Sequence, residues 1–145
     1  MIRALIVALL LGSTAHAQVT LQQEAEALTS AMVAAFKADP SSVAKYYADD
    51  ASILGGGQRA VGREQIDAYW RGATMFADWK LEVLEVGGDG ASPWVRGRST
   101  LQGKSGRTMV TEFVGLLKRQ PDGKLRFYVD MYVAAAPGMT RVPDR

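Results

Sequence analysis

The residues best able to do chemistry are charged side chains on the strands predicted near the C-terminus. The positions of the turns place Arg96, Glu112 and Asp130 in one row across three neighbouring strands. Two carboxylates beside an arginine could act as a general acid–base pair, since their surroundings can separate their pKa values. The same row is also an ordinary cross-strand charge cluster, in or beside an interface, and we favour that interpretation.

The composition excludes several other kinds of site. The 145-residue chain contains no cysteine, which rules out a disulfide, a thiolate zinc site and a cysteine nucleophile. Its one histidine, His16, lies in a segment that we expect to be removed, so a histidine-based triad or metal cluster is also excluded. The carboxylates have no tight metal-ligand spacing, and the glycines of 57–64 lack the lysine of a phosphate-binding loop. We therefore expect no metal and no cofactor.

The first 17 residues have the order of a secretory signal peptide. Arg3 precedes the apolar run 4–11, and Ala15, His16 and Ala17 form a cleavage triplet. We expect cleavage after Ala17 and a periplasmic or secreted protein. The apolar run is too short to anchor the chain in a membrane, and no other segment approaches the required length. The mature chain has nearly balanced charge, which gives no electrostatic footprint for nucleic acid.

Helical periodicity in the first half of the chain changes to strand periodicity at Asp78. Thr20 and Gln23 form a predicted capping box. The pattern predicts helices over 21–37, 40–47 and 63–76, and strands over 47–54, 78–86, 92–101, 107–118 and 124–134. The alternation slips at Leu84, which predicts a β-bulge. This order indicates an α+β domain over 18–136, followed by a flexible tail over 137–145.

The turns also give a predicted register for the last three strands. Leu117 is expected opposite Leu125, Thr111 opposite Met131, and Gly97 opposite Thr111. One face of the sheet is then almost wholly apolar and should meet the helices. The other face is mixed, and large apolar groups there favour a symmetric homodimer. The expected interface residues are Trp94, Arg96, Glu112, Val114, Tyr128, Asp130 and Tyr132.

Small residues on the apolar face could leave a hollow between sheet and helices. The candidate lining for a small apolar or aromatic ligand is Phe36, Tyr47, Asp50, Trp70, Trp79, Thr111, Phe113 and Met131. The apolar members could equally be a filled core. Asp50 could act at the mouth of the pocket, although an acid in such a position more often caps a turn or pairs with an arginine.

Three short motifs resemble those of the cystatin-like α+β families, which include SnoaL-like polyketide cyclases, ketosteroid isomerases and nuclear-transport-factor-2-like domains. They are the segments 47–52, 62–66 and 121–125, and the resemblance extends over 21–134. It implies a cone in which a curved antiparallel sheet wraps three N-terminal helices around a pocket, usually in a homodimer. The motifs are specific for this fold and weak for function.

The resemblance also places the catalytic positions of those enzymes on this chain. The ketosteroid isomerase base falls at Gly55, its oxyanion tyrosine at Ala31 and its acid at Gly115. Histidines of many SnoaL-like members fall at about Val129 and Met131. None of these five residues can do the required chemistry, which favours a protein without the known catalytic groups of the family.

We therefore expect an exported homodimeric protein that binds a small apolar or aromatic molecule without chemistry. The first alternative is an isomerase, cyclase or hydrolase that uses Asp50, Glu112 or Asp130. The second is a module whose exposed sheet face binds a different protein. An open hollow behind Thr111 favours binding, and a buried carboxylate reaching into that hollow favours the enzyme.

Overall fold

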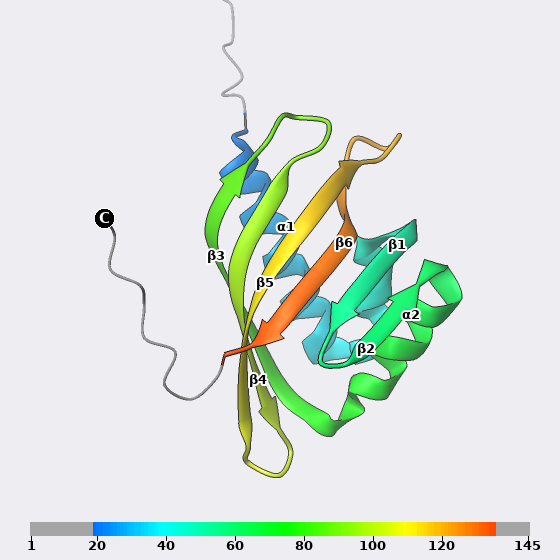
Figure 1. The fold of residues 1–145 in the computed structure, drawn as a ribbon, viewed down its shortest axis with the longest axis vertical. Coiled ribbons are helices and arrows are strands. Elements are labelled where there is room, and N and C mark those ends of the chain that lie inside the picture. The colour runs from blue at the N-terminus through cyan, green and yellow to red at the C-terminus, as the bar shows by residue number, and fades with distance from the viewer. Residues whose placement is uncertain (1–18, 136–145) are drawn as a thin grey trace, which may run out of the picture.

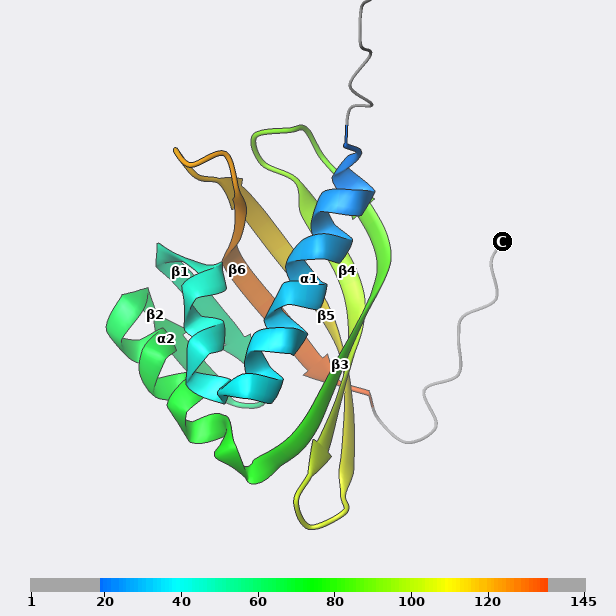
Figure 2. The ribbon, with the colours of Figure 1, turned by 180° about the vertical axis from the view of Figure 1, so that it is seen from behind.

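A curved six-stranded sheet with helices on one face makes up residues 19–135, the part of the chain that this computed structural model describes (Figures 1 and 2). The segments predicted as a signal peptide and as a tail from residue 137 lie outside these residues. Within the described part, no helix is both long and apolar enough to cross a membrane.

The first two helical segments begin at capping residues that the sequence provides. Helix α1 (Leu21–Ala38) starts with the predicted capping box, in which the backbone N–H of Gln23 donates to Thr20 Oγ1 at 3.2 Å. Asp39 then caps the 3₁₀-helix η1 (Pro40–Tyr46) by accepting from the backbone of Ser41. Helix α2 (Gly62–Arg71) continues into the 3₁₀-helix η2 (Gly72–Met75). Figure 2 shows α1 lying across the face of the sheet.

The sheet is mixed, which corrects the expectation of a wholly antiparallel one. Its strands are β1 (Tyr47–Gly55), β2 (Gln58–Val61), β3 (Phe76–Gly87), β4 (Trp94–Gly103), β5 (Thr108–Arg119) and β6 (Leu125–Ala134). Their order is β2-β1-β6-β5-β4-β3, and β1 pairs with β6 in parallel. The chain leaves the sheet after the β1–β2 hairpin, forms α2 and re-enters at the opposite edge. The last strand then returns beside the first.

Strand β2 was not predicted from the sequence. It is only four residues long and carries exposed Gln58 and Arg59, so its hydrophobic pattern is weak. Gly56 and Gly57 both have positive φ angles, 56° and 75°, and make the hairpin turn that joins β1 to β2.

The register between β3, β4 and β5 preserves the predicted faces. A shift between Val83 and Glu85 confirms the bulge expected near Leu84. Gly97 pairs with Phe113, two residues from the predicted partner, and a shift of two leaves every side chain on its own face. A Cβ atom at Gly97 would collide with the Phe113 ring and the Glu82 carbonyl, so only glycine fits there.

The predicted register between β5 and β6 is wrong. Leu117 pairs with Phe127 while Leu116 pairs with Val129, so Tyr128 is an extra residue in β6. Because strand side chains alternate, one inserted residue moves every later side chain to the opposite face. Asp130 and Tyr132 therefore point toward the helices.

The predicted row of Arg96, Glu112 and Asp130 consequently does not exist. Arg96 pairs with Glu85 at 3.1 Å, whereas Glu112 lies 3.8 Å from Arg98. Both ion pairs lie on the outer face of the sheet, and Asp130 lies on the other.

Aromatic side chains dominate the core between the helices and the sheet. Trp70 of α2 packs on Trp79 of β3 with ring centroids 5.1 Å apart, and Phe36 of α1 meets Trp79 edge-on at 5.5 Å. Tyr47 and Phe127 join this cluster from β1 and β6. The cluster fills one part of the concave side of the sheet and leaves the space beside it open.

Candidate functional site

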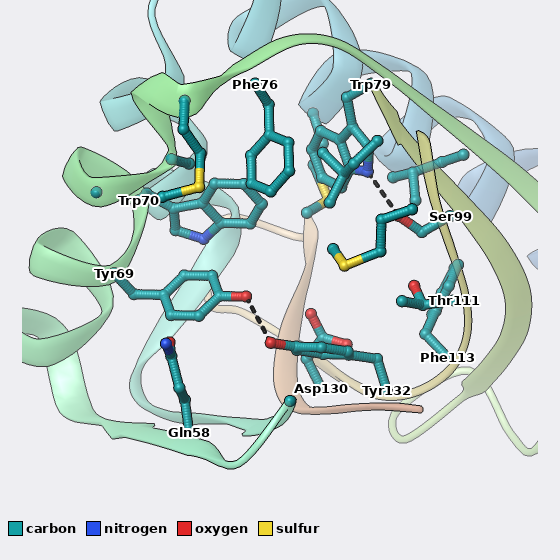
Figure 3. Close-up of a pocket in the computed structure, with 18 of the residues that line it drawn as sticks. Gln58, Tyr69, Trp70, Phe76, Trp79, Ser99, Thr111, Phe113, Asp130 and Tyr132 are labelled. Atoms are coloured by element: carbon teal, nitrogen blue, oxygen red, sulfur yellow. Dashed lines mark hydrogen bonds between the residues drawn. The ribbon is translucent and has the colours of Figure 1, made fainter. Parts of the chain in front are cut away.

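A cavity of about 530 Å³ opens between α2, η2 and the concave face of the sheet (Figure 3). Its walls come from α1, the β1–β2 hairpin, α2, η2 and strands β3 to β6. Most of the lining is apolar or aromatic: Met32, Ala68, Trp70, Ala73, Met75, Phe76, Trp79, Leu81, Leu101, Met109, Phe113 and Phe127. The lining side chains that carry a hydroxyl, amide or carboxyl group are Gln58, Tyr69, Ser99, Thr111, Asp130 and Tyr132.

Asp130 is the one carboxylate in this lining. The Tyr47 hydroxyl donates a hydrogen bond of 2.7 Å to its Oδ2 atom. Within residues 19–135 the other oxygen, Oδ1, makes no hydrogen bond to protein. Tyr47 is fully buried and does not belong to the cavity lining, so it binds the carboxyl from behind the cavity wall. Asp130 can therefore offer Oδ1 to a molecule in the cavity.

Burial raises the pKa of Asp130 from its usual 3.8 to about 6, and the hydrogen bond from Tyr47 opposes this rise. The pKa of Tyr47 is raised well above its ordinary value by burial and then by the neighbouring Asp130 charge. Tyr47 thus stays protonated and remains a donor. A carboxyl that titrates near neutral pH can both accept and return a proton, which is what general acid–base chemistry requires.

Two tyrosines lie beside Asp130. The Tyr69 hydroxyl of α2 donates to the Tyr132 hydroxyl of β6 at 3.1 Å (Figure 3). Burial, followed by this hydrogen bond, raises the pKa of Tyr69. Because Tyr132 accepts from Tyr69, its own hydroxyl proton is available to an acceptor in the cavity.

The ring of Tyr132 occupies the space above Gly55. A Cβ atom at Gly55 would lie 2.6 Å from three atoms of that ring. Gly55 is the position to which the sequence resemblance assigned the isomerase base. In this chain a tyrosine from β6 fills the place that a side chain at Gly55 would need.

Trp70 contributes a buried donor next to this group. Its indole ring lies 6.1 Å from the Tyr47 ring, and its N–H acts to lower the Tyr47 pKa. The geometry falls short of a normal hydrogen bond, so among the described residues Trp70 Nε1 is the fully buried side-chain polar atom that has no partner. Trp70 Nε1 therefore lies near the Tyr47 hydroxyl without forming a hydrogen bond.

Several predicted ligand residues lie at the cavity. Trp70, Trp79, Thr111 and Phe113 are all part of its lining. Phe36 lies one layer behind them, in contact with Trp70 and Trp79.

Two predicted ligand residues lie away from the cavity, which corrects their assignment. Asp50 is exposed on β1 and pairs with Lys118 at 3.1 Å. Met131 is 44% exposed on the outer face, because the bulge at Tyr128 reverses its direction.

The sequence named Asp130 as a possible acid–base residue but did not place Asp130, Tyr132 or Tyr69 at the cavity. Asp130 and Tyr132 were assigned to the outer face because the apolar alternation of β6 continues unbroken through Phe127, Val129 and Met131. That alternation gives no sign of the extra residue. Tyr69 was visible only as part of an apolar helix face. The described residues contain no group of three or more acidic or histidine side chains placed to hold a metal ion.

Solved structures with the same fold support this description. A ketosteroid isomerase-like protein from Erwinia carotovora atroseptica is 23% identical and has a TM-score of 0.67, with 81% of this chain and 100% of that chain covered. A protein of unknown function with a cystatin-like fold from Nostoc punctiforme is 14% identical, with a TM-score of 0.69 and coverages of 82% and 96%. A conserved protein from Planctomyces limnophilus is 13% identical, with a TM-score of 0.65 and coverages of 79% and 95%.

The TM-scores show a shared fold, which is the cystatin-like arrangement expected from the sequence. A search of curated proteins finds no match to the chain. Residues 28–128 match the model of the SnoaL-like domain. The match covers most of the chain, and of the elements around the cavity it leaves out only the start of α1 and the larger part of β6. The chain therefore belongs to the SnoaL-like domain family.

Proposed function

We propose that this protein binds a small, mainly apolar molecule in the cavity and that Asp130 exchanges a proton with it. The observation that carries the proposal is a carboxyl with a raised pKa that faces an apolar cavity through an unoccupied oxygen. The sequence favoured binding without chemistry, because Gly55, Ala31 and Gly115 carry no catalytic group. Asp130 supplies such a group from a different strand.

Binding rests on the apolar and aromatic walls. Burial of apolar surface yields about 25 cal/mol per Å², and the cavity volume is in the range of ordinary small-molecule sites. Trp70, Trp79 and Phe113 present ring surfaces on which a flat molecule can pack. Tyr69 and Tyr132 add hydrogen-bonding groups that orient it.

The chemistry that suits this arrangement is proton transfer beside a carbonyl. Asp130 Oδ1 takes the proton from the carbon next to the carbonyl, and the electron pair of the broken C–H bond moves to the carbonyl oxygen. The Tyr132 hydroxyl donates a hydrogen bond to that oxygen as its charge develops. Return of the proton from Asp130 to another carbon of the same conjugated system gives an isomer, so no other reactant is needed.

Deuterium exchange into a flat aromatic ketone tests this proposal. In D₂O near pH 7, the full-length protein should speed exchange at the carbon next to the carbonyl of 1-tetralone, followed by NMR. Asp130→Asn should lower the protein-dependent rate by about 100-fold or more, since the base is lost. Binding of the ketone, followed by calorimetry, should persist because the walls are unchanged.

Glu112→Gln is the matched control, because Glu112 is a half-exposed carboxylate on the outer face of β5. It should leave both exchange and binding unaltered. Equal exchange rates in the native protein and Asp130→Asn would remove acid–base chemistry from the proposal and leave binding alone. Absence of binding to the native protein would remove both parts.

We also propose that the protein is a homodimer joined through the outer face of the sheet. Support comes from large apolar side chains that no helix covers: Leu116, Tyr128, Met131 and Val133 are 41%, 38%, 44% and 63% exposed. Trp94, Arg96, Glu112 and Val114 share this face, so they stay in the proposed interface. Asp130 and Tyr132 leave it because they face the cavity.

Export to the periplasm or the exterior remains part of the proposal. It rests on residues 1–17, which lie outside the described residues and have the order of a signal peptide. A mature chain would then begin at Gln18, three residues before the first residue of α1.

A further inference from the structure

Two hydroxyl side chains form a second polar spot on the floor of the cavity. Ser99 of β4 and Thr111 of β5 lie directly opposite each other in the sheet, and both line the cavity (Figure 3). Their residues are 8% and 3% exposed. Their neighbours in the lining are apolar, so the two hydroxyl groups form an isolated polar spot in a hydrophobic wall.

Ser99 is held in position by a tryptophan. Trp79 donates its indole N–H to Ser99 Oγ at 2.8 Å (Figure 3). This bond uses an acceptor position of the serine oxygen and leaves the serine proton available. Ser99 can therefore donate to an atom in the cavity.

Thr111 has no protein partner for its hydroxyl within residues 19–135. Among these residues, Trp70 Nε1 is the one side-chain polar atom that is both fully buried and without a hydrogen-bond partner. The Thr111 oxygen has no partner either, so it is not fully buried. The remaining exposure of Thr111 opens onto the cavity that it lines. Burying a hydroxyl in an apolar wall costs free energy unless the hydroxyl forms a hydrogen bond. A valine at this position would have the same shape as the threonine and would not carry this cost. The position is thus suited to a polar atom that enters the cavity.

The Ser99–Thr111 pair and Asp130 lie at separate places along the sheet face of the cavity. Asp130 pairs across the sheet with Gly115, four residues along β5 from Thr111. Four strand residues span about 13 Å along the backbone. Phe113 lies between the two polar spots on the same face.

We propose that Ser99 and Thr111 form a second polar subsite, which donates hydrogen bonds to a hydroxyl or carbonyl oxygen at the far end of the ligand. The ligand class is then a flat, mainly apolar molecule with an oxygen at each end. One oxygen meets Asp130 and Tyr132, and the other meets Ser99 and Thr111. This inference rests on the proposed function in one respect, namely that the cavity is a ligand site.

Two rigid probes that differ by one hydroxyl test the subsite. 4-Hydroxystilbene has one terminal oxygen, and 4,4′-dihydroxystilbene has one at each end. Affinities are measured with the full-length protein by calorimetry and by quenching of tryptophan fluorescence. The native protein should prefer the dihydroxy compound by roughly fivefold to tenfold, the effect of one added hydrogen bond. Thr111→Val should reduce that preference to near one and leave the affinity for 4-hydroxystilbene unchanged.

Two further variants make the result specific. Thr111→Ser retains the hydroxyl and should keep the preference, which separates the hydrogen bond from a change in packing. Thr100→Val alters a threonine on the outer face of the neighbouring strand and should have no effect.

Equal affinities for the two probes in the native protein, or a preference that survives Thr111→Val, would overturn the subsite. If exchange still depends on Asp130, the proposed function stands without it. Binding of neither probe to the native protein would overturn the subsite, and if 1-tetralone also fails to bind, the ligand cavity falls with it.

Discussion

Asp130 owes its chemical character to three surroundings that the residue type alone does not supply. The bulge at Tyr128 turns it inward, the apolar cavity raises its pKa to about 6, and Tyr47 fixes one of its oxygens. An aspartate on the outer face of β6 would share none of these. The role that we assign to it follows from its position.

The raised pKa predicts a specific dependence of stability on pH. The folded protein binds the Asp130 proton more tightly than the unfolded chain, whose aspartate has a pKa near 3.8. The stabilisation from this proton is fully present below about pH 4 and is lost as the pH rises through about 6. Asp130→Asn mimics the protonated form and should be more stable than the native protein above pH 6, by up to about 3 kcal/mol.

Chemical denaturation between pH 4 and pH 8 measures this difference. The groups that face the carboxyl are Tyr47, Tyr69 and Tyr132. Burial raises the pKa values of Tyr47 and Tyr69 above the ordinary value for tyrosine, so neither of these two changes charge in that range. Glu112→Gln should give a curve parallel to that of the native protein. Parallel curves for Asp130→Asn would contradict the assigned pKa.

At the scale of elements, the motifs that carry the family resemblance have a structural explanation. Arg63, at the start of α2, donates to the backbone carbonyls of Ala44 and Tyr47 at 2.6 and 2.7 Å, and it pairs with Asp49 at 2.9 Å. It therefore ties α2 to the junction of η1 and β1. That junction positions Tyr47 behind Asp130, so these motifs build the frame of the site and carry no chemistry themselves.

The parallel pairing of β1 and β6 makes a second testable contact between elements. Gly55 pairs with Tyr132, and a Cβ atom there would lie 2.6 Å from the tyrosine ring. Gly55→Ala should displace the ring, break the bond between Tyr69 and Tyr132, and lower the free energy of unfolding by about 1–3 kcal/mol. Deuterium exchange should slow, because the donor to the carbonyl oxygen moves.

Gly90→Ala is the matched control, since no atom lies within 4 Å of a Cβ atom at Gly90 and its φ is not positive. In a protein that already carries Tyr132→Ala, the substitution Gly55→Ala should cost much less stability than it does in the native protein, as expected for two residues in direct contact. If the two substitutions are additive in denaturation measurements, the ring and Gly55 do not compete for space.

At the scale of the whole molecule, the sheet has two faces with different tasks. The concave face encloses the cavity, and the outer face presents uncovered apolar side chains. Replacing Val114 and Tyr128 by glutamate should yield a folded monomer, because charges at the centre of an apolar interface prevent association. Sedimentation velocity and native mass spectrometry measure the oligomeric state of this variant.

The same mass measurement on exported native protein tests the proposed cleavage site. The mass should correspond to a dimer of chains that begin at Gln18.

A control with the same added charge uses Ser30→Glu with Ala34→Glu, two exposed positions on α1. That variant should remain a dimer. A dimer unchanged by the substitutions at Val114 and Tyr128 would place the interface elsewhere, and a monomeric native protein would leave this face for a different partner.

The sequence by itself determined the helices, most of the strands and the family fold. These features depend on local signals: the capping box at Thr20, the cap at Asp39, the change of period at Asp78 and the slip at Leu84. Each such signal lies within a few residues of the structure that it specifies. The α+β class and the apolar inner face follow from their order.

Only the tertiary structure decided which face carries Asp130, where β1 lies in the sheet, and that the space behind Thr111 is open. The bulge at Tyr128 interrupts no visible alternation, and the parallel pairing of β1 with β6 joins segments far apart in the chain. An open cavity is a property of how aromatic side chains from several elements pack around one space. Such features arise from contacts between distant residues, so no local pattern in the sequence specifies them.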